Sequence, residues 1–248
     1  MAYVIGFVIA VVIALTGVGA GTITAPLLIL FLHIPGAEAV GTALGYATIV
    51  KCVIVPVQIA RKQVSYRVFG FMLLGGGPGV LIGSLLFRRV ASNPAILYWI
   101  LGTINVFASL MQIASPYLRK RIETSRQDRL GLIAALMFPI GGEVGLSSSG
   151  AGALGTLALL SCTSLAPSQV VGTDLLFGLV VAMIGSGVHF VFGAYNGALL
   201  VQLVAGGVLG AIAGSTLAPF LPSRYLRVAL ACWLLLVGTD FCFRAAAL

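Results

Sequence analysis

The stretch TGVGAGTITAP, from Thr16 to Pro26, decides the fold because it interrupts a long apolar segment. That segment extends from Tyr3 to Leu32 without a charged residue. Glycine inside a helix costs about 0.5–1 kcal/mol relative to alanine, and proline costs about 3 kcal/mol. Three glycines and a proline in its middle therefore predict a helix that breaks and resumes.

The composition explains why a long apolar segment is present. Of the 248 residues, 60 % are hydrophobic and 8 % are charged, and the mean hydropathy is +1.13. Because soluble domains carry about 25 % charged residues, the chain is expected to be an all-α polytopic membrane protein. Apolar stretches of about 17–25 residues favour helices over the alternating strands of a barrel. The net charge of +8 is interpreted as orientation by cytoplasmic Lys and Arg, with no nucleic-acid partner.

The apolar stretches fall into two similar halves. Residues 1–114 form the first predicted membrane repeat, 115–129 a basic cytoplasmic loop, and 130–248 the second repeat. Each half begins with a broken segment and continues with three spans. The first half has Tyr3–Leu32, Ala39–Ala60, Val68–Phe87 and Pro94–Ala114; the second has Leu130–Thr163, Val170–Phe192, Ala198–Leu221 and Val228–Phe243.

A single shift of 131 residues aligns the halves without a gap. It places Gly19-Ala20-Gly21 on Gly150-Ala151-Gly152, and Gly41-Thr42 on Gly172-Thr173. It also aligns two series of glycines spaced by four, which we interpret as helix-packing faces: Gly75, Gly79 and Gly83 on Gly206, Gly210 and Gly214. Internal duplication of this kind is common in secondary transporters.

The broken segments decide whether the repeats are inverted or parallel. If each enters and returns as a hairpin, each half has three crossings and the repeats are inverted; if each crosses once, they are parallel. The arms Tyr3–Leu15 and Ile23–Leu32 would be roughly 20 and 15 Å long, too short to span a ~30 Å core. Basic residues outside the spans divide ten to three with hairpins and nine to four with single crossings. We favour hairpins and inverted repeats, and the parallel alternative stays open.

Broken helices in a membrane are tolerated where they are buried in protein or line a cavity. Their free N–H groups and positive ends suit a small anion. The glycines of the first break and the serines of the second, in GLSSSGAG (Gly145–Gly152), are therefore the predicted anion site. The candidate substrate-binding residues are Gly17, Gly19, Ala20, Gly21, Thr22, Thr42, Lys51, Ser147, Ser148, Ser149, Gly150, Gly152 and Thr173.

Ionisable residues inside spans are functional candidates because their insertion is costly. Lys51 could neutralise a bound anion, or pair with Glu143 or Asp174. Glu143, Asp174 and His189 are candidates for proton coupling. His189 aligns with Gln58 under the 131-residue shift, and a structural role as a hydrogen-bond donor is the alternative for it.

These motifs resemble the sulfite exporter TauE/SafE family. The resemblance rests on GxGAG followed by a proline, on P…AVGT from Pro35 to Thr42, and on GAGALGTLALL, LAPSQVVGTDLL and GALLVQLVAGGVLGAIAGSTLAPFLP in the second half. It covers nearly the whole chain. It implies a secondary transporter in the cytoplasmic (inner) membrane, exporting sulfite, an organosulfonate or a related sulfur oxyanion by alternating access.

Two other functions are alternatives to a transporter. A passive anion channel would use the same site without concentrating the anion. An intramembrane serine hydrolase would pair Ser147 with His189, but the first break has no serine and a dyad would not explain a break in both halves. No nucleotide motif of the GxxxxGK[ST] type is present. We therefore expect no enzyme activity, no cofactor and no metal, and the glycine faces leave a homodimer open.

Overall fold

The computed structural model describes residues 1–248 except 17–19, 123–127, 149–151, 218–222 and 248. The described residues form ten helices, so the all-α prediction is confirmed. The first half contains α1 (Ala2–Thr16), α2 (Ala20–Leu32), α3 (Gly36–Ala60), α4 (Tyr66–Ala91) and α5 (Pro94–Ile122). The second contains α6 (Leu130–Ser147), α7 (Ala153–Cys162), α8 (Pro167–Val191), α9 (Gly197–Leu217) and α10 (Ser223–Ala246).

Seven helices of the described chain are long and apolar enough to cross a membrane, so the polytopic prediction is confirmed. They are α3, α4, α6, α8, α9 and the stretches Pro94–Ala114 of α5 and Val228–Ala246 of α10. The bounds of α8 are those of α3 shifted by 131 residues at both ends, the shift that aligns the sequence motifs.

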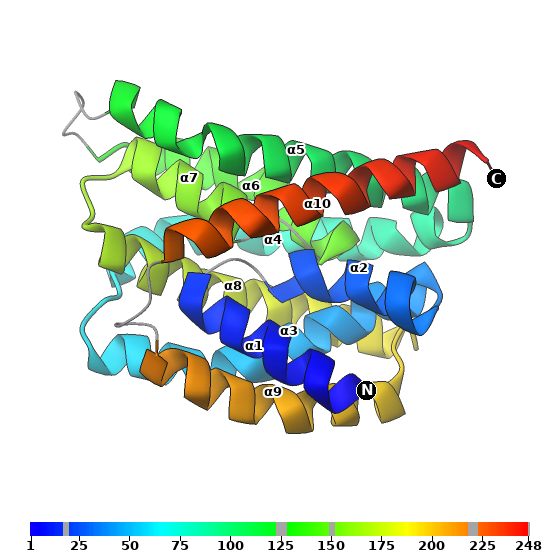
Figure 1. The fold of residues 1–248 in the computed structure, drawn as a ribbon. Helices are drawn as coiled ribbons and strands as arrows, with labels where there is room; N and C mark the ends of the chain where they lie inside the picture. The colour runs from blue at the N-terminus through cyan, green and yellow to red at the C-terminus, as the bar shows by residue number, and fades with distance from the viewer. Residues whose placement is uncertain (17–19, 123–127, 149–151, 218–222, 248) are drawn as a thin grey trace.

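The start of α1 and the end of α2 lie at the same end of the bundle (Figure 1). The backbone of Gly206 lies against Tyr3 and that of Gly210 against Phe7, so α1 and α9 run in the same direction. The Thr42 hydroxyl of α3 accepts a hydrogen bond from the Asn196 N–H at 2.9 Å, which brings the starts of α3 and α9 to one end. Since α2 leads directly into α3, the α1–α2 segment is a hairpin.

The α6–α7 segment has the same form at the opposite end. The backbone of Gly75 lies against Ala134 and that of Gly79 against Phe138, so α6 and α4 run in the same direction. The Ser65 N–H donates to the Thr173 hydroxyl at 2.9 Å, which brings the start of α4 to the start of α8. These backbone contacts confirm that the glycines spaced by four are packing faces.

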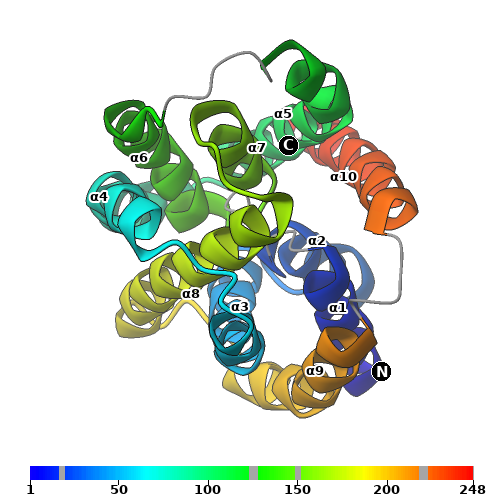
Figure 2. The same cartoon turned by 90° about the vertical axis from the view of Figure 1, so that its left-hand side faces the viewer.

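Corresponding helices of the two halves run antiparallel. For α3 and α8, Gly41 near the start of α3 packs against Ala194 just after α8. Gly172 near the start of α8 packs against Gln63 just after α3. On α5 and α10 the Ser109 hydroxyl donates to the Ala231 carbonyl at 2.7 Å. The first helix of each half packs on a helix of the other half: α1 on α9 and α6 on α4 (Figure 2).

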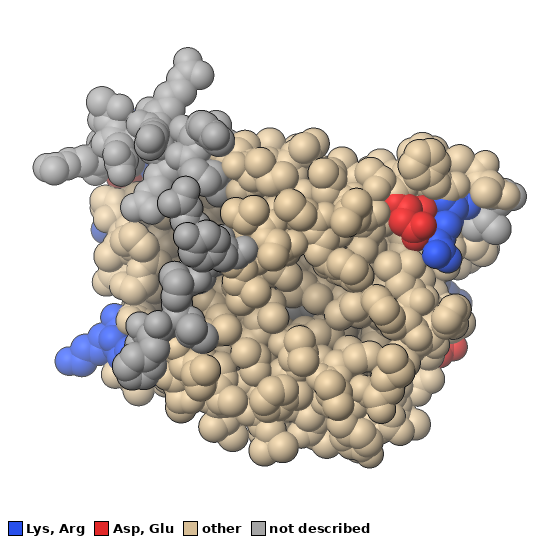
Figure 3. Space-filling model, in the orientation of Figure 1, with Lys and Arg blue, Asp and Glu red and all other residues tan. Residues whose placement is uncertain are grey.

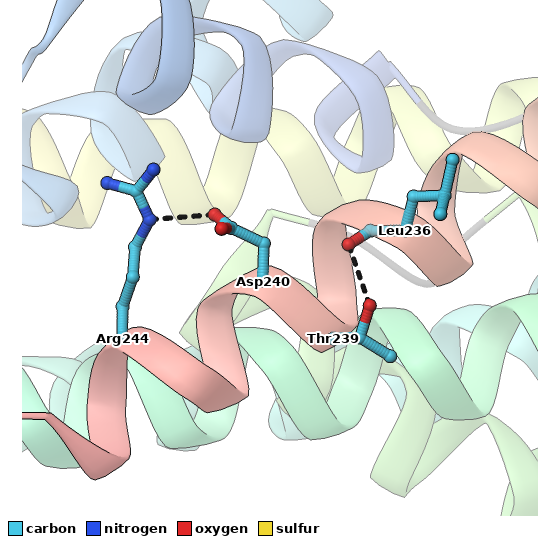
Figure 4. Close-up of polar contacts among 4 residues, drawn as sticks. All are labelled: Leu236, Thr239, Asp240 and Arg244. Atoms are coloured by element: carbon cyan, nitrogen blue, oxygen red, sulfur yellow. Dashed lines mark hydrogen bonds and ion pairs between the residues drawn. The ribbon is translucent and has the colours of Figure 1, made fainter.

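The exposed charges gather at the ends of the bundle. Figure 3 shows one face, with Lys, Arg, Asp and Glu side chains at its two ends and none of them across the band between. Near the C-terminal end of α10 the Arg244 Nε atom lies 2.7 Å from Asp240 Oδ2, and both side chains are exposed (Figure 4). Asp240 is thus the ion-pair partner of Arg244 on the same helix.

Candidate functional site

The two helix breaks meet through Gly21 and Ser148. Ser148 ends α6 with a positive φ of 60°, and its N–H donates to the Val144 carbonyl at 2.8 Å. Gly21, in the first turn of α2, packs against the Ser148 carbonyl so closely that a Cβ on it would overlap that oxygen. The structure thus brings together two of the predicted substrate-binding residues from opposite halves.

The Ser148 hydroxyl is the unusual group at this contact. Its oxygen is buried, and it has no hydrogen-bond partner among the described residues. The neighbouring Ser147 hydroxyl donates to the Glu143 carbonyl at 3.1 Å. An unsatisfied buried hydroxyl costs about 1–3 kcal/mol, so the Ser148 oxygen marks a place where a polar ligand would be favourable.

Other predicted residues of the breaks are placed only in part. Thr22 is buried in the first turn of α2. Gly152 is buried just before α7. Ala20 is the first residue of α2. Gly17, Gly19, Ser149 and Gly150 lie outside the described residues.

Lys51 and Asp174 lie together in the interior. Lys51 of α3 and Asp174 of α8 are 4 % and 2 % exposed, and the charge of Asp174 acts on Lys51. Asp174 Oδ2 accepts a hydrogen bond at 3.0 Å from the Thr156 hydroxyl of α7. Of the two carboxylates predicted as partners of Lys51, Asp174 is the one whose charge acts on it. Thr156 was not among the predicted site residues, although it lies within the quoted stretch GAGALGTLALL.

The hydroxyls of Thr42 and Thr173 contact loop residues. Each uses its hydroxyl to hold the N–H of a loop residue, Asn196 and Ser65 respectively. Asn196 and Ser65 are themselves related by the 131-residue shift, so this contact occurs once at each end. Loop anchoring gives the two Gly-Thr pairs a structural role, and their part in substrate binding stays a prediction.

His189 joins α8 to the end of α6. Its Nε2 atom is 3.0 Å from the Gly145 carbonyl, and its ring packs against Phe87 with the centroids 4.4 Å apart. The imidazole is fully buried, and its Nδ1 atom has no partner among the described residues. The Nε2 contact is made to a backbone oxygen and not to Ser147, which fits the structural alternative for His189.

Glu143 lines a separate cavity of about 860 Å³ between α4, α5, α6 and α7. The other lining residues are mainly apolar, including Phe107, Leu136 and Phe138, whose side chains are exposed on the surface of the bundle. The Oε1 atom of Glu143 is buried and has no hydrogen-bond partner among the described residues. Lys51, for which Glu143 was the other predicted partner, does not line this cavity.

Broken helices that meet inside a multi-span bundle, with buried charges beside them, define a polytopic membrane protein with an internal polar site. The model of the sulfite exporter TauE/SafE family matches residues 2–241. A curated relative, the probable membrane transporter protein YjnA of Bacillus subtilis (strain 168), is 27 % identical over 243 residues, covering 94 % of this chain and 95 % of the relative. No solved structure matches.

The chain belongs to the sulfite exporter TauE/SafE family. It is accordingly a multi-pass membrane transporter, and the family is not one of enzymes. The resemblance identified from the sequence motifs is confirmed.

Proposed function

We propose that the protein exports sulfite, an organosulfonate or a related small sulfur oxyanion across the cytoplasmic membrane by alternating access. The family supports a sulfur anion as substrate. The single structural observation that carries the site is the buried Ser148 hydroxyl, without a partner among the described residues, beside the first turn of α2. There the anion would meet a hydroxyl donor and a positive helix end.

Lys51 supplies the positive charge for this function. It is buried and interacts electrostatically with Asp174, so an arriving anion has to share Lys51 with that carboxylate. Asp174 and Glu143 are the proposed carriers of a coupling proton. Glu143 faces an apolar cavity without a cationic partner among its lining residues, which favours exchange of a proton over a permanent charge.

The two halves act as inverted repeats in this proposal. The antiparallel α3–α8 pair and the opposed hairpins support it. Both hairpins then approach the site from opposite sides of the membrane, as alternating access requires. By the positive-inside rule, the basic segment 115–129 faces the cytoplasm.

The test uses the full chain in proteoliposomes. Charge movement on a solid-supported membrane is recorded for sulfite, sulfate, thiosulfate, sulfoacetate, taurine and chloride, with and without a pH gradient. Isotope flux then detects electroneutral exchange. Lys51→Ala should abolish the response to the transported anion. Thr239→Val is the matched control, because this exposed hydroxyl donates to the carbonyl of Leu236 on its own helix (Figure 4).

The outcomes separate the candidates. Accumulation of a sulfur anion against its gradient, lost in Lys51→Ala and kept in Thr239→Val, supports the exporter. Flux that only dissipates a gradient would instead identify a channel. Absence of flux for every sulfur anion in the panel would overturn the substrate assignment.

A further inference from the structure

The first turn of α7 is already occupied by a carboxylate of the protein. Asp174 reaches it from α8, and its Oδ2 atom accepts the Thr156 hydroxyl hydrogen bond at 3.0 Å. Its Oδ1 atom lies against the backbone of Gly155, where a Cβ would overlap it. Because α7 begins at Ala153, both contacts fall in the turn whose N–H groups attract negative charge.

Lys51 completes this group. Its ammonium is buried on α3, and the negative charge that acts on it comes from Asp174. Removing one partner of a buried charge pair is strongly destabilising because the other charge is left uncompensated. Asp174 therefore serves two positive groups at once, the helix end of α7 and Lys51.

The first half has no such group. Under the 131-residue shift, Asp174 corresponds to Ala43, Lys51 to Ala182 and Thr156 to Ala25. Gly155, which the carboxylate contacts, corresponds to Thr24, a residue with a neutral side chain. Ala43 and Thr24 are both fully buried. At these aligned positions the two halves therefore differ in charge.

We propose that Asp174 is a tethered anion: it fills the second helix break with the protein's own carboxylate, while the first break admits a free anion. Removal of Asp174 would then expose a latent site for a small oxyanion, held by Lys51 and the Thr156 hydroxyl. The part that concerns the first break rests on the proposed function; the latent site does not. One substrate anion is therefore bound per chain, although two breaks are present.

Anion rescue of stability tests the tethered anion without any transport measurement. Asp174→Ala introduces the residue that the first half has at position 43. The purified full chain is heated while its tryptophan fluorescence is followed, in sulfite, sulfate or chloride at constant ionic strength. Asp174→Ala should unfold at a lower temperature than the wild type. Each anion that fits should raise its unfolding temperature saturably, and by more than it raises that of the wild type.

The double variant Lys51→Ala/Asp174→Ala is the matched control. It removes both charges and should lose the excess anion response. An anion response of Asp174→Ala equal to that of the wild type would overturn the proposal, and so would an excess that persists without Lys51. If Asp174→Ala cannot be purified, Asp174→Asn keeps the shape and removes the charge. Failure of both variants to fold even with the anions present would also count against the latent site.

These outcomes are distinguishable from failure of the proposed function. If the wild type transports no sulfur anion but anions stabilise Asp174→Ala in a Lys51-dependent way, the exporter proposal is rejected and the tethered-anion proposal is supported. If the wild type transports a sulfur anion but no anion stabilises Asp174→Ala beyond the wild type, the exporter proposal is supported and the tethered-anion proposal is rejected.

Discussion

Gly21 and Ser148 come from opposite halves of the chain, yet their backbones are in direct contact. The contact joins the first turn of α2 to Ser148, the C-cap residue of α6. Because a side chain at position 21 has no space, the glycine is required by its neighbour Ser148, while its own backbone is ordinary helix. The α2 backbone can approach Ser148 this closely because Gly21 has no Cβ.

The contact predicts the effect of Gly21→Ala. The added methyl group would overlap the Ser148 carbonyl, and overpacking of this kind costs about 1–3 kcal/mol. We expect a lower unfolding temperature and loss of anion flux. Gly70→Ala is the control, because a Cβ at Gly70 meets nothing within 4 Å. If Gly21→Ala matched Gly70→Ala in both measurements, the close contact would be wrong.

Ser148→Gly separates the backbone of Ser148 from its hydroxyl. Residue 148 has φ of 60°, a conformation that glycine adopts without penalty and other residues rarely do. The corresponding residue of the first half is Gly17. We expect unchanged or higher thermal stability together with weaker anion binding, measured as a higher concentration for half-maximal flux. Unchanged affinity would remove the hydroxyl from the site.

Thr42→Val and Thr173→Val should resemble one another. Each removes the acceptor of one loop N–H, from Asn196 or Ser65, at a cost of about 1 kcal/mol in stability. The double variant should lose the sum of the two, since the contacts lie at opposite ends of the bundle. Denaturation in mild detergent measures these losses. A large change in anion affinity without loss of stability would instead place these residues in the substrate site.

His189→Gln introduces the residue that the first half carries as Gln58. Its amide can still donate to the Gly145 carbonyl, the contact that His189 Nε2 now makes. We expect retained transport with an unchanged dependence on pH, recorded between about pH 5 and 8 where histidine titrates. His189→Leu, which cannot donate, should lower stability. A pH profile altered in His189→Gln would restore the proton-coupling role.

Glu143 should react with a hydrophobic carbodiimide. Its carboxyl lines the apolar cavity between α4 and α7, and Oε1 has no partner among the described residues. Asp174, held by Thr156, should react much less. Peptide mass spectrometry locates the adduct, and Glu143→Gln is the control that should abolish it. Labelling of Asp174 in preference to Glu143 would contradict the described packing.

Much of this architecture follows from composition and period. The spans could be predicted because long apolar runs have few alternatives to helices in a membrane. The breaks could be predicted because glycines spaced by two define no helix face, unlike those spaced by four. The spacing of four residues in the Gly75 and Gly206 series was enough to predict packing faces.

The site could be predicted less well, for a physical reason. Thr42 and Thr173 recur in both halves, but recurrence also arises when a loop must be anchored twice. The pairing of Lys51 with Asp174 and not Glu143 depends on which faces of α6 and α8 turn inward, and a nearly uniform apolar sequence does not encode that rotation. Thr156 is identified only through its contact with Asp174.

The packing of α1 on α9 and of α6 on α4 has a consequence for how the protein can be made. Neither half carries the surface on which its own first helix rests, so a polypeptide cut within residues 115–129 would yield two fragments that each lack a partner. They would have to be synthesised together and inserted in opposite orientations. During synthesis of the intact chain, α1 is therefore made and inserted well before α9, the helix on which it packs.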